Sequence, residues 1–362
     1  DPLHVYGLCR ELAAPRYAGR LTGHAGYTAA ARRAAELLEQ WGLEPVPGTD
    51  GFLQAFPCPY TIVRSAELTI LRRAADGGDS SVALAAPDDF LPMLFSDGGD
   101  VTADLVFAGW GIGAPELGYD DYAGLEVEGR FVVCFRGTPD RERHEFEEQD
   151  HHRRRMEAAR ERGAAGLFYI YDEPIANPNG ELLAGFLCGV ISTAAADALL
   201  AGHQTNSAEL KRELAAGNGP RSFALGSRAR FNISVDHHPD GIGYNVLGML
   251  RGADDARDGS CVVLGAHLDH CGEHMGITFA GAQDNASGSA VVLEIARAFA
   301  RLERPPARTV VFALFGAEEM GLLGSNAAAE FLALRFGRIE GMLNFDMVGQ
   351  GDGTNCGVTS DP

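Results

Sequence analysis

Three short runs of apolar residues stand out in the last third of the chain. The runs cover residues 261–266, 309–315 and 342–345. Each has the length and apolar content of a strand that is buried on both faces of a sheet. Between the first two runs, apolar residues recur at helical spacing, at Val292, Ile295, Ala296 and Phe299. A strand, a helix and further strands predict an α/β fold with a mixed, mostly parallel central sheet flanked by helices.

The first part of the chain has two other patterns. Between Gly26 and Gly42, alanines, leucines and a tryptophan recur at helical spacing, which predicts an amphipathic helix that packs on a core and ends at Gly42. From Phe52 to Leu71, apolar and polar residues roughly alternate. This alternation is typical of half-buried antiparallel strands.

The middle of the chain has a different pattern of apolar residues and glycines. Between about residues 95 and 227, short apolar runs such as 105–108 and 131–135 are separated by glycine-rich turns. This spacing indicates a separate, smaller β-rich domain. We therefore expect one domain built from residues 1–94 and 228–362, with residues 95–227 inserted into it.

Two local patterns in and after this insert predict further elements. Residues 140–162 carry many charges of both signs, which predicts a solvated helix whose three histidines face water. These histidines are His144, His151 and His152. Residues 231–235 alternate and are followed by Asp240-Gly241, so we expect a hairpin with residues 245–250 as its second strand.

Composition and charge narrow the class of protein. Of the 362 residues, 46% are hydrophobic and 22% are charged, as in an ordinary globular protein. A formal net charge of −20 repels phosphate backbones and anionic membrane surfaces, so we expect no nucleic-acid partner. The most apolar window, residues 186–200, is interrupted by polar residues and is too short to span a membrane. The chain opens with Asp1 rather than Met, which favours a removed leading segment and a location outside the cytoplasm.

The seven cysteines indicate neither a disulfide framework nor a metal site. They are odd in number and never spaced as C-x-x-C, which argues against a disulfide scaffold and against a thiolate zinc site. One or two bridges remain open as an alternative, whereas buried thiols are the commoner fate of such cysteines.

Polar clusters follow each of the three predicted strands. His267 and Asp269 follow the first strand, Glu318 and Glu319 the second, and Asp346 the third. A fourth cluster around Asp284 precedes the predicted helix. Because the carboxyl ends of strands in an α/β sheet share one edge, we expect all four segments to meet there.

These residue types in one place indicate a metal site. Carboxylates that converge repel one another unless cations neutralise them, and a set of imidazole and carboxylate ligands suits zinc. Two cations bridged by one carboxylate would make a shared water acidic enough to attack an amide. Glu318 and Glu319 point in different directions, so that one can bind metal while the other serves as general base. Taken alone, His267 would be interpreted as an ordinary histidine and Asp284 as a helix cap. The prediction of a metal site therefore depends on all four segments occurring together.

The motifs around these residues resemble those of metallopeptidase family 28, whose members are co-catalytic zinc aminopeptidases. The motifs are His267-Leu268-Asp269-His270, Asp284-Asn285-Ala286-Ser287-Gly288, Glu318-Glu319-Met320-Gly321-Leu322-Leu323-Gly324-Ser325 and Asn344-Phe345-Asp346-Met347. The segment from about Leu105 to Phe223 resembles the protease-associated domain that many members carry as an insertion. The residues that carry this second resemblance are Phe107-Ala108-Gly109-Trp110-Gly111-Ile112 and Gly163-Ala164-Ala165-Gly166. The likeness spans nearly the whole chain and implies a zinc exopeptidase-like fold.

The resemblance implies a role for each motif residue, with two zinc ions as cofactor. His267 and Asp346 would bind the first zinc, Asp284 would bridge, and Glu319 would bind the second zinc. Glu318 would be the general base, and the Asp269 carboxylate would orient the imidazole of His267. The family also implies a cis peptide bond between Asp284 and Asn285. No role follows for four nearby residues, His270, Cys271, Glu273 and His274.

One departure from the family concerns the second zinc. The family supplies a further histidine to this ion from a loop after the Asp346 strand, and residues 347–362 contain none. Truncation, substitution by another segment, and weak binding of the second metal are the alternatives, of which truncation is favoured. This 362-residue form is therefore expected to hold the first metal better than the second and to hydrolyse peptides poorly.

The resemblance leaves three functions to weigh. The leading one is an exopeptidase that removes N-terminal residues from peptide substrates. A carboxypeptidase or dipeptidase of the same fold is the second, and a non-catalytic, receptor-like binding protein is the third. The presence of Glu318 and of four candidate ligands speaks against the third.

Overall fold

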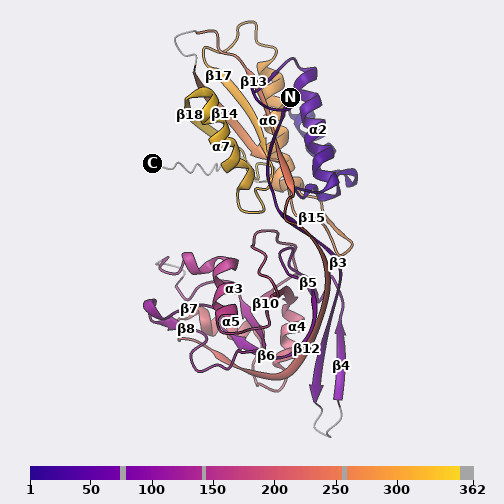
Figure 1. Cartoon of the computed structure of the whole chain (residues 1–362), viewed down its shortest axis with the longest axis vertical. Coiled ribbons are helices and arrows are strands. Elements are labelled where there is room, and N and C mark those ends of the chain that lie inside the picture. Colours follow the sequence, from indigo (N-terminus) through magenta and orange to yellow (C-terminus); the bar gives the residue numbers. More distant parts are fainter. Residues whose placement is uncertain (74–78, 141–143, 255–258, 351–362) are drawn as a thin grey trace. The chain divides into compact units, whose positions relative to one another are not determined.

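The computed structural model divides the chain into two compact units (Figure 1). It describes residues 1–73, 79–140, 144–254 and 259–350. The first unit consists of Asp1–Pro59 and Pro239–Pro362, and the second of Tyr60–His238.

The second unit is therefore longer than the expected insert of residues 95–227. Its boundaries lie further out because β3 (Tyr60–Arg73) pairs with β12 (Ser222–His238) along most of its length. This ladder places residues 60–71 in the second unit, and residues 90–92 pair with residues 189–191 of the same unit. The assignment of this unit as a protease-associated domain stays a prediction.

The first unit is built on a six-stranded mixed sheet. The strand order is β1-β13-β17-β14-β18, with β2 also paired to β13. The strands are β1 (Glu44–Pro45), β2 (Leu53–Pro57), β13 (Ile242–Leu250), β14 (Ser260–His267), β17 (Thr309–Phe315) and β18 (Arg338–Asn344). β14 is parallel to both β17 and β18, whereas β13 pairs antiparallel with β17, β1 and β2. The α/β class with a mixed sheet is confirmed, but the parallel part is limited to the three strands that carry the predicted site.

Helices cover both faces of this sheet (Figure 1). α1 (Pro2–Leu12), α2 (Ala25–Gln40) and α6 (Ser287–Phe299) pack on one face, and α7 (Leu323–Phe336) packs on the other. The helix predicted from the spacing of alanines and leucines is α2, whose Ala30, Ala34 and Leu38 are fully or almost fully buried. Shorter elements complete the unit: η1 (Pro15–Arg20), η5 (Ala282–Ala286), β15 (Gly272–His274) and β16 (Ile277–Phe279).

Strand register brings the predicted site residues to one level. His267 at the end of β14 lies opposite Phe315 at the end of β17. On the other side of β14, Gly265 lies opposite Asn344, the last residue of β18. The residues after β17 and β18 therefore emerge beside His267, at the carboxyl edge of the parallel strands.

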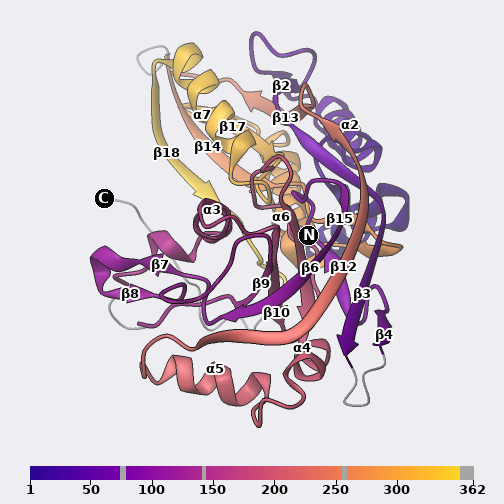
Figure 2. The same ribbon diagram turned by 60° about the horizontal axis from the view of Figure 1, so that its bottom comes forward.

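The second unit is built on an eight-stranded sheet. Its order is β4-β3-β12-β6-β9-β10-β11-β5. The further strands are β4 (Asp79–Leu84), β5 (Phe90–Pro92), β6 (Gly99–Ala108), β9 (Phe131–Phe135), β10 (Gly166–Tyr171) and β11 (Leu187–Ser192). Its helices are α3 (His152–Glu161), α4 (Thr193–Leu200) and α5 (Ser207–Ala215), with η2 (Pro115–Leu117), η3 (Glu148–Asp150) and the small pair β7 (Gly113–Ala114) and β8 (Tyr119–Asp120). Leucines of α4 and α5, which lie together in Figure 2, enter one core with phenylalanines of the sheet.

One local prediction around the insert is wrong, and a second is confirmed only in part, because His144 and His151 are exposed whereas His152 is not. The expected hairpin does not form, because β12 pairs with β3 and β6 in the second unit whereas β13 pairs within the first. Alternation at residues 231–235 reflects burial of Phe231 and Ile233 in the core of the second unit. The charged segment becomes α-helical only at His152, and residues 141–143 lie outside the described part. His152 is buried rather than water-facing, because its ring packs against Tyr169.

Within the described ranges, no helix is both long enough and apolar enough to cross a membrane. The six cysteines in those ranges are all free, and Cys356 lies outside them.

Candidate metal centre

Three predicted metal ligands from separate segments converge at the carboxyl edge of β14. The Nε2 atom of His267 lies 3.1 Å from Oδ1 of Asp284 and 3.3 Å from Oδ1 of Asp346. The imidazole is almost completely buried, whereas the two carboxylates are partly exposed. The three ligand atoms therefore surround one point that opens toward solvent.

The spacing of these atoms fits a bound cation. Two ligand atoms about 2.0–2.1 Å from one tetrahedral zinc ion lie roughly 3.3 Å apart, close to both measured separations. One imidazole and two carboxylates also match the three protein ligands typical of a catalytic zinc site. Donor chemistry and geometry thus agree for this group.

The electrostatics of His267 show that this point favours positive charge. Burial alone would lower the pKa of the imidazole, but hydrogen bonding to Asp269, Asp284 and Asp346 outweighs burial and raises it to about 12. Conversely, the hydrogen bond from His267 lowers the pKa of Asp284 against its own burial. A cation bound among these carboxylates would compensate the same negative charge and leave the imidazole neutral.

Asp284 is positioned by the loop that precedes α6. The peptide bond between Asp284 and Asn285 is cis, as the family resemblance implies. The fully buried Asn285 side chain donates to the Phe345 carbonyl at 2.9 Å, and its Oδ1 accepts from Gly288 N at 2.9 Å and from Met347 N at 3.2 Å. One amide thus holds the loop of Asp284 against the segment that carries Asp346.

The turn after β17 places Glu318 and Glu319. The fully buried Asp269 carboxylate accepts the backbone N–H of Glu318 at 3.2 Å and that of Glu319 at 3.3 Å. Toward His267, the nearest Asp269 atom to Nδ1 is the backbone oxygen at 3.2 Å, with Oδ1 at 3.7 Å. Asp269 therefore links the histidine strand to the glutamate turn, and its main-chain carbonyl makes the closer contact to the imidazole.

The carboxyl of Glu318 has a raised pKa. Burial raises the pKa of its carboxyl to about 7, with the negative charges of Asp269, Glu319 and Asp346 adding to the rise and His267 opposing it. A carboxylate that titrates near neutral pH is well matched to proton transfer. Burial and neighbouring charges are the usual means by which a glutamate acquires such a value.

Glu319 lies in a second group, beside residues for which the sequence assigned no role. His270 Nδ1 lies 2.6 Å from Oε1 of Glu319 and 4.0 Å from Oδ2 of Asp284. Candidate ligand atoms of His270, Cys271 and Glu319 all lie within 4.8 Å of one another. Asp284 consequently faces both groups, with Oδ1 toward His267 and Oδ2 toward His270. The other unassigned pair, Glu273 and His274, lies in β15 and is in neither group.

Arg20 supports the site and was not predicted. Its guanidinium is fully buried and donates to four backbone carbonyls, those of Leu12, Leu268, Ala280 and Gly281. These contacts tie η1 to the end of β14 and to the loop that leads to Asp284. A single arginine far away in the sequence carries no pattern that would reveal this role.

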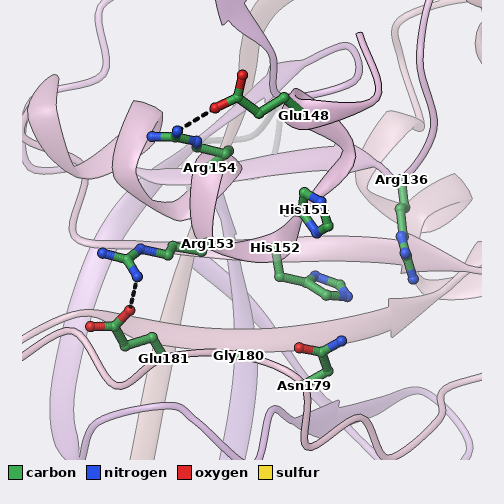
Figure 3. Close-up of a pocket in the computed structure, with 9 residues that line it drawn as sticks. All are labelled: Arg136, Glu148, His151, His152, Arg153, Arg154, Asn179, Gly180 and Glu181. Carbon is green, nitrogen blue, oxygen red and sulfur yellow. Dashed lines mark hydrogen bonds and ion pairs between the residues drawn. The ribbon is translucent and has the colours of Figure 1, made fainter. Parts of the chain in front are cut away.

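A pocket in the second unit differs in character from this centre (Figure 3). It has a volume of about 640 Å³, and its two glutamates, Glu148 and Glu181, pair with Arg154 and Arg153. His152 lines the pocket, but burial and then nearby Arg136 lower its pKa to about 3. Because its carboxylates are neutralised by arginines, this pocket has no comparable demand for a cation.

Comparison with known proteins agrees with the geometry. Residues 245–358, which include every residue of both ligand groups, match the model of peptidase family M28. Leupeptin-inactivating enzyme 1 of Streptomyces exfoliatus is 41% identical over 108 residues, which cover 30% of this chain and 23% of that protein. An aminopeptidase of Pseudomonas aeruginosa is 38% identical over 129 residues, which cover 33% of this chain and 22% of the relative. The match thus spans less than a quarter of the length of these curated relatives.

The fold has a similar counterpart among solved structures. A zinc aminopeptidase from Bacillus subtilis aligns with a TM-score of 0.64 at 21% identity, covering 96% of this chain and 69% of that one. At this identity the likeness shows the fold. Together with the sequence match, it leads to one conclusion: residues 245–358 of this chain match peptidase family M28, within a fold that is similar to that of a zinc aminopeptidase.

Proposed function

We propose that this chain is a metal-dependent aminopeptidase that binds two zinc ions and removes N-terminal residues from peptides by hydrolysis. The observation that carries the proposal is the convergence of His267, Asp284 and Asp346 at spacings that suit one cation, with Glu318 beside them. Two relatives, an aminopeptidase and a leupeptin-inactivating enzyme, support the same function.

Each of the two ligand groups would hold one cation. His267, Asp346 and Oδ1 of Asp284 would hold the first cation, and Glu319 and Oδ2 of Asp284 the second. When bound, such cations polarise the scissile carbonyl and make a water acidic at neutral pH. The chain's contribution is a rigid frame, because Asn285, Asp269 and Arg20 hold the four segments through buried hydrogen bonds.

Glu318 would move the proton in this reaction. Its carboxylate takes a proton from the attacking water and, once protonated, donates it to the nitrogen of the leaving amine. A pKa near 7 suits both steps, because the carboxylate is a stronger base than an ordinary glutamate and the protonated carboxyl is still more acidic than the ammonium group of the released amine.

The test compares a peptide that has a free amino terminus with the same peptide N-acetylated. After removal of metal by a chelator and addition of zinc, we expect cleavage of the free peptide from its amino end and no cleavage of the blocked one. Glu318→Gln should abolish most of the rate while retaining the zinc content, since its carboxylate is not a ligand in the proposal. Release of residues from the carboxyl end would instead establish a carboxypeptidase, and zinc binding without any hydrolysis would overturn the proposed activity.

A further inference from the structure

Three side chains of metal-binding type form a second, compact cluster in the first unit. They are His270, Cys271 and Glu319, whose ligand atoms all lie within 4.8 Å of one another. The cluster lies next to Asp284 Oδ2, which is 4.0 Å from Nδ1 of His270. Two of these residues follow the end of β14 directly, and the third lies in the turn after β17, so the cluster has two independent backbone anchors.

The ring of His270 is held in place by the backbone around it. Its main-chain N–H donates to the Arg20 carbonyl at 3.3 Å. A Cβ on Gly281 would come within 2.6 Å of the Cβ and Cγ atoms of His270, so the glycine leaves the space that the histidine occupies. Gly281 also has a positive φ of 58°, a conformation that a substituted residue would adopt only with strain. The position of the imidazole is thus built into the loop.

Nδ1 of His270 faces a carboxylate oxygen of Glu319. It lies 2.6 Å from Oε1 of Glu319, with both side chains largely buried at 17% and 18% exposure. A proton shared between these two atoms would lie where a cation would bind. Binding of a metal ion displaces such protons from its ligands. Admitting zinc requires the two atoms to separate to roughly 3.3 Å, a shift that a side-chain rotation supplies.

Cys271 adds a donor of a different kind. It is 8% exposed, and within the described ranges its thiol makes no hydrogen bond. A buried thiol among carboxylates has no obvious structural partner, whereas a thiolate is among the strongest ligands for zinc and cobalt. The absence of C-x-x-C spacing predicted no thiolate zinc site, but that spacing reports only sites with several cysteines.

We propose that His270 and Cys271 are protein ligands of the second cation, together with Glu319 and the bridging Asp284. The second site would then have a nitrogen, a sulfur and two carboxylate donors, all of them atoms that bind zinc. The first site would keep three protein ligands and an open position. This inference rests on the proposed function for the existence of the two-metal centre, and it names two further ligands of that centre.

Cobalt titration of the metal-free, full 362-residue chain tests the ligand set. We expect two equivalents to bind, and the equivalent in the second site to produce the intense near-ultraviolet band of a thiolate-to-cobalt charge transfer. Cys271→Ser should remove the band, while Cys261→Ser, a buried cysteine at the start of β14, should leave it unchanged. His270→Ala should weaken the second equivalent at least 10- to 100-fold with little effect on the first.

Competition with a chelator gives the two affinities without any assay of activity, and a thermal melt confirms that each variant is folded. His270→Gln, which is closer in size, serves if His270→Ala does not fold. Two bound cobalt ions without the charge-transfer band, or a second affinity that both variants leave unchanged, would overturn the inference. In that case peptide hydrolysis by the two-metal protein would show that the proposed function stands. If no cobalt binds at a site sensitive to His267→Ala, both the function and the inference fail.

Discussion

The two units of this protein both bury charged side chains, yet they satisfy them in different ways. In the second unit, Asp121 and Arg155 are completely or almost completely buried and both contact the backbone around Trp110. Asp121 Oδ2 accepts from the N–H groups of Trp110 and Ile112, and Nε of Arg155 donates to the Trp110 carbonyl at 2.7 Å. Each charge is met by donors or acceptors of the protein itself.

At the candidate metal centre of the first unit, two carboxylates share one imidazole instead. Asp284 and Asp346 face one imidazole, and the buried side of Glu318 lies near the carboxylates of Asp269, Glu319 and Asp346. In the same unit, Arg20 and Asp269 are met by backbone groups, as the charges of the second unit are. Buried charge that the backbone satisfies is structural, whereas converging carboxylates that lack protein donors indicate a site for a cation.

The sharpest test of this contrast is removal of the bridging carboxylate. Asp284→Ala should lower peptidase activity more than about 1,000-fold and remove metal from both sites, because one side chain serves both ligand groups. Zinc content after dialysis and kcat/KM on a free peptide measure the effect. Asp104→Ala, an exposed aspartate on β6, is the matched control and should change neither. Retention of two zinc ions by Asp284→Ala would contradict the bridging role.

The next effect concerns the general base. Glu318→Gln should lower kcat by about 10²–10⁴-fold. Because the active form is the carboxylate and its pKa is raised from 4.5 to about 7, the rate should fall as pH drops below about 7. Bound cations favour the carboxylate and move this limb toward lower pH. A pH profile of kcat is the measurement, and a limb that persists unchanged in Glu318→Gln would show that another group titrates.

The second unit should respond in stability rather than in chemistry. Arg155→Ala leaves the carbonyls of Trp110, Gly137 and Asp150 without their donor, which should lower the free energy of unfolding by about 3 kcal/mol. Arg153→Ala, at an exposed position of the same helix, should change it by less than about 1 kcal/mol. Urea unfolding followed by Trp110 fluorescence in a Trp41→Phe background reports on this unit. Equal effects of the two variants would contradict a structural role for Arg155.

The smallest effect is expected at Asp269. Backbone groups satisfy its carboxylate, and it also lies at the metal centre. Its carboxylate holds the backbone of Glu318 and Glu319, so Asp269→Asn should weaken zinc binding about 10- to 100-fold. Asparagine retains one acceptor oxygen, which is why the loss stays below that of Asp284→Ala. Chelator competition measures the affinity. An unchanged zinc affinity would show that the turn keeps its shape without the second acceptor.

Local patterns predicted the elements whose burial is periodic. The spacing of residues 26–42 predicted α2, and the apolar run 309–315 coincides with β17. The hairpin across Asp240-Gly241 failed because alternation reports that a strand has one buried face and does not say which sheet it joins. The helix within residues 140–162 began late for a related reason, since charge content marks solvent exposure and not the first helical residue.

The residues of the metal centre could be named from the amino-acid types at the ends of apolar runs, because strands that share a sheet share an edge. How these residues divide into two groups could not be predicted from the sequence. Folding decided that Glu319 stands beside His270 and Cys271 rather than beside His267, and that the Asp269 carboxylate holds the glutamate turn. Nor could a linear pattern reveal Arg20, whose four acceptors come from segments up to 261 positions away. Composition and periodicity report which face of an element is buried, whereas contacts between loops depend on register, turn geometry and long-range hydrogen bonds that exist only in the folded chain.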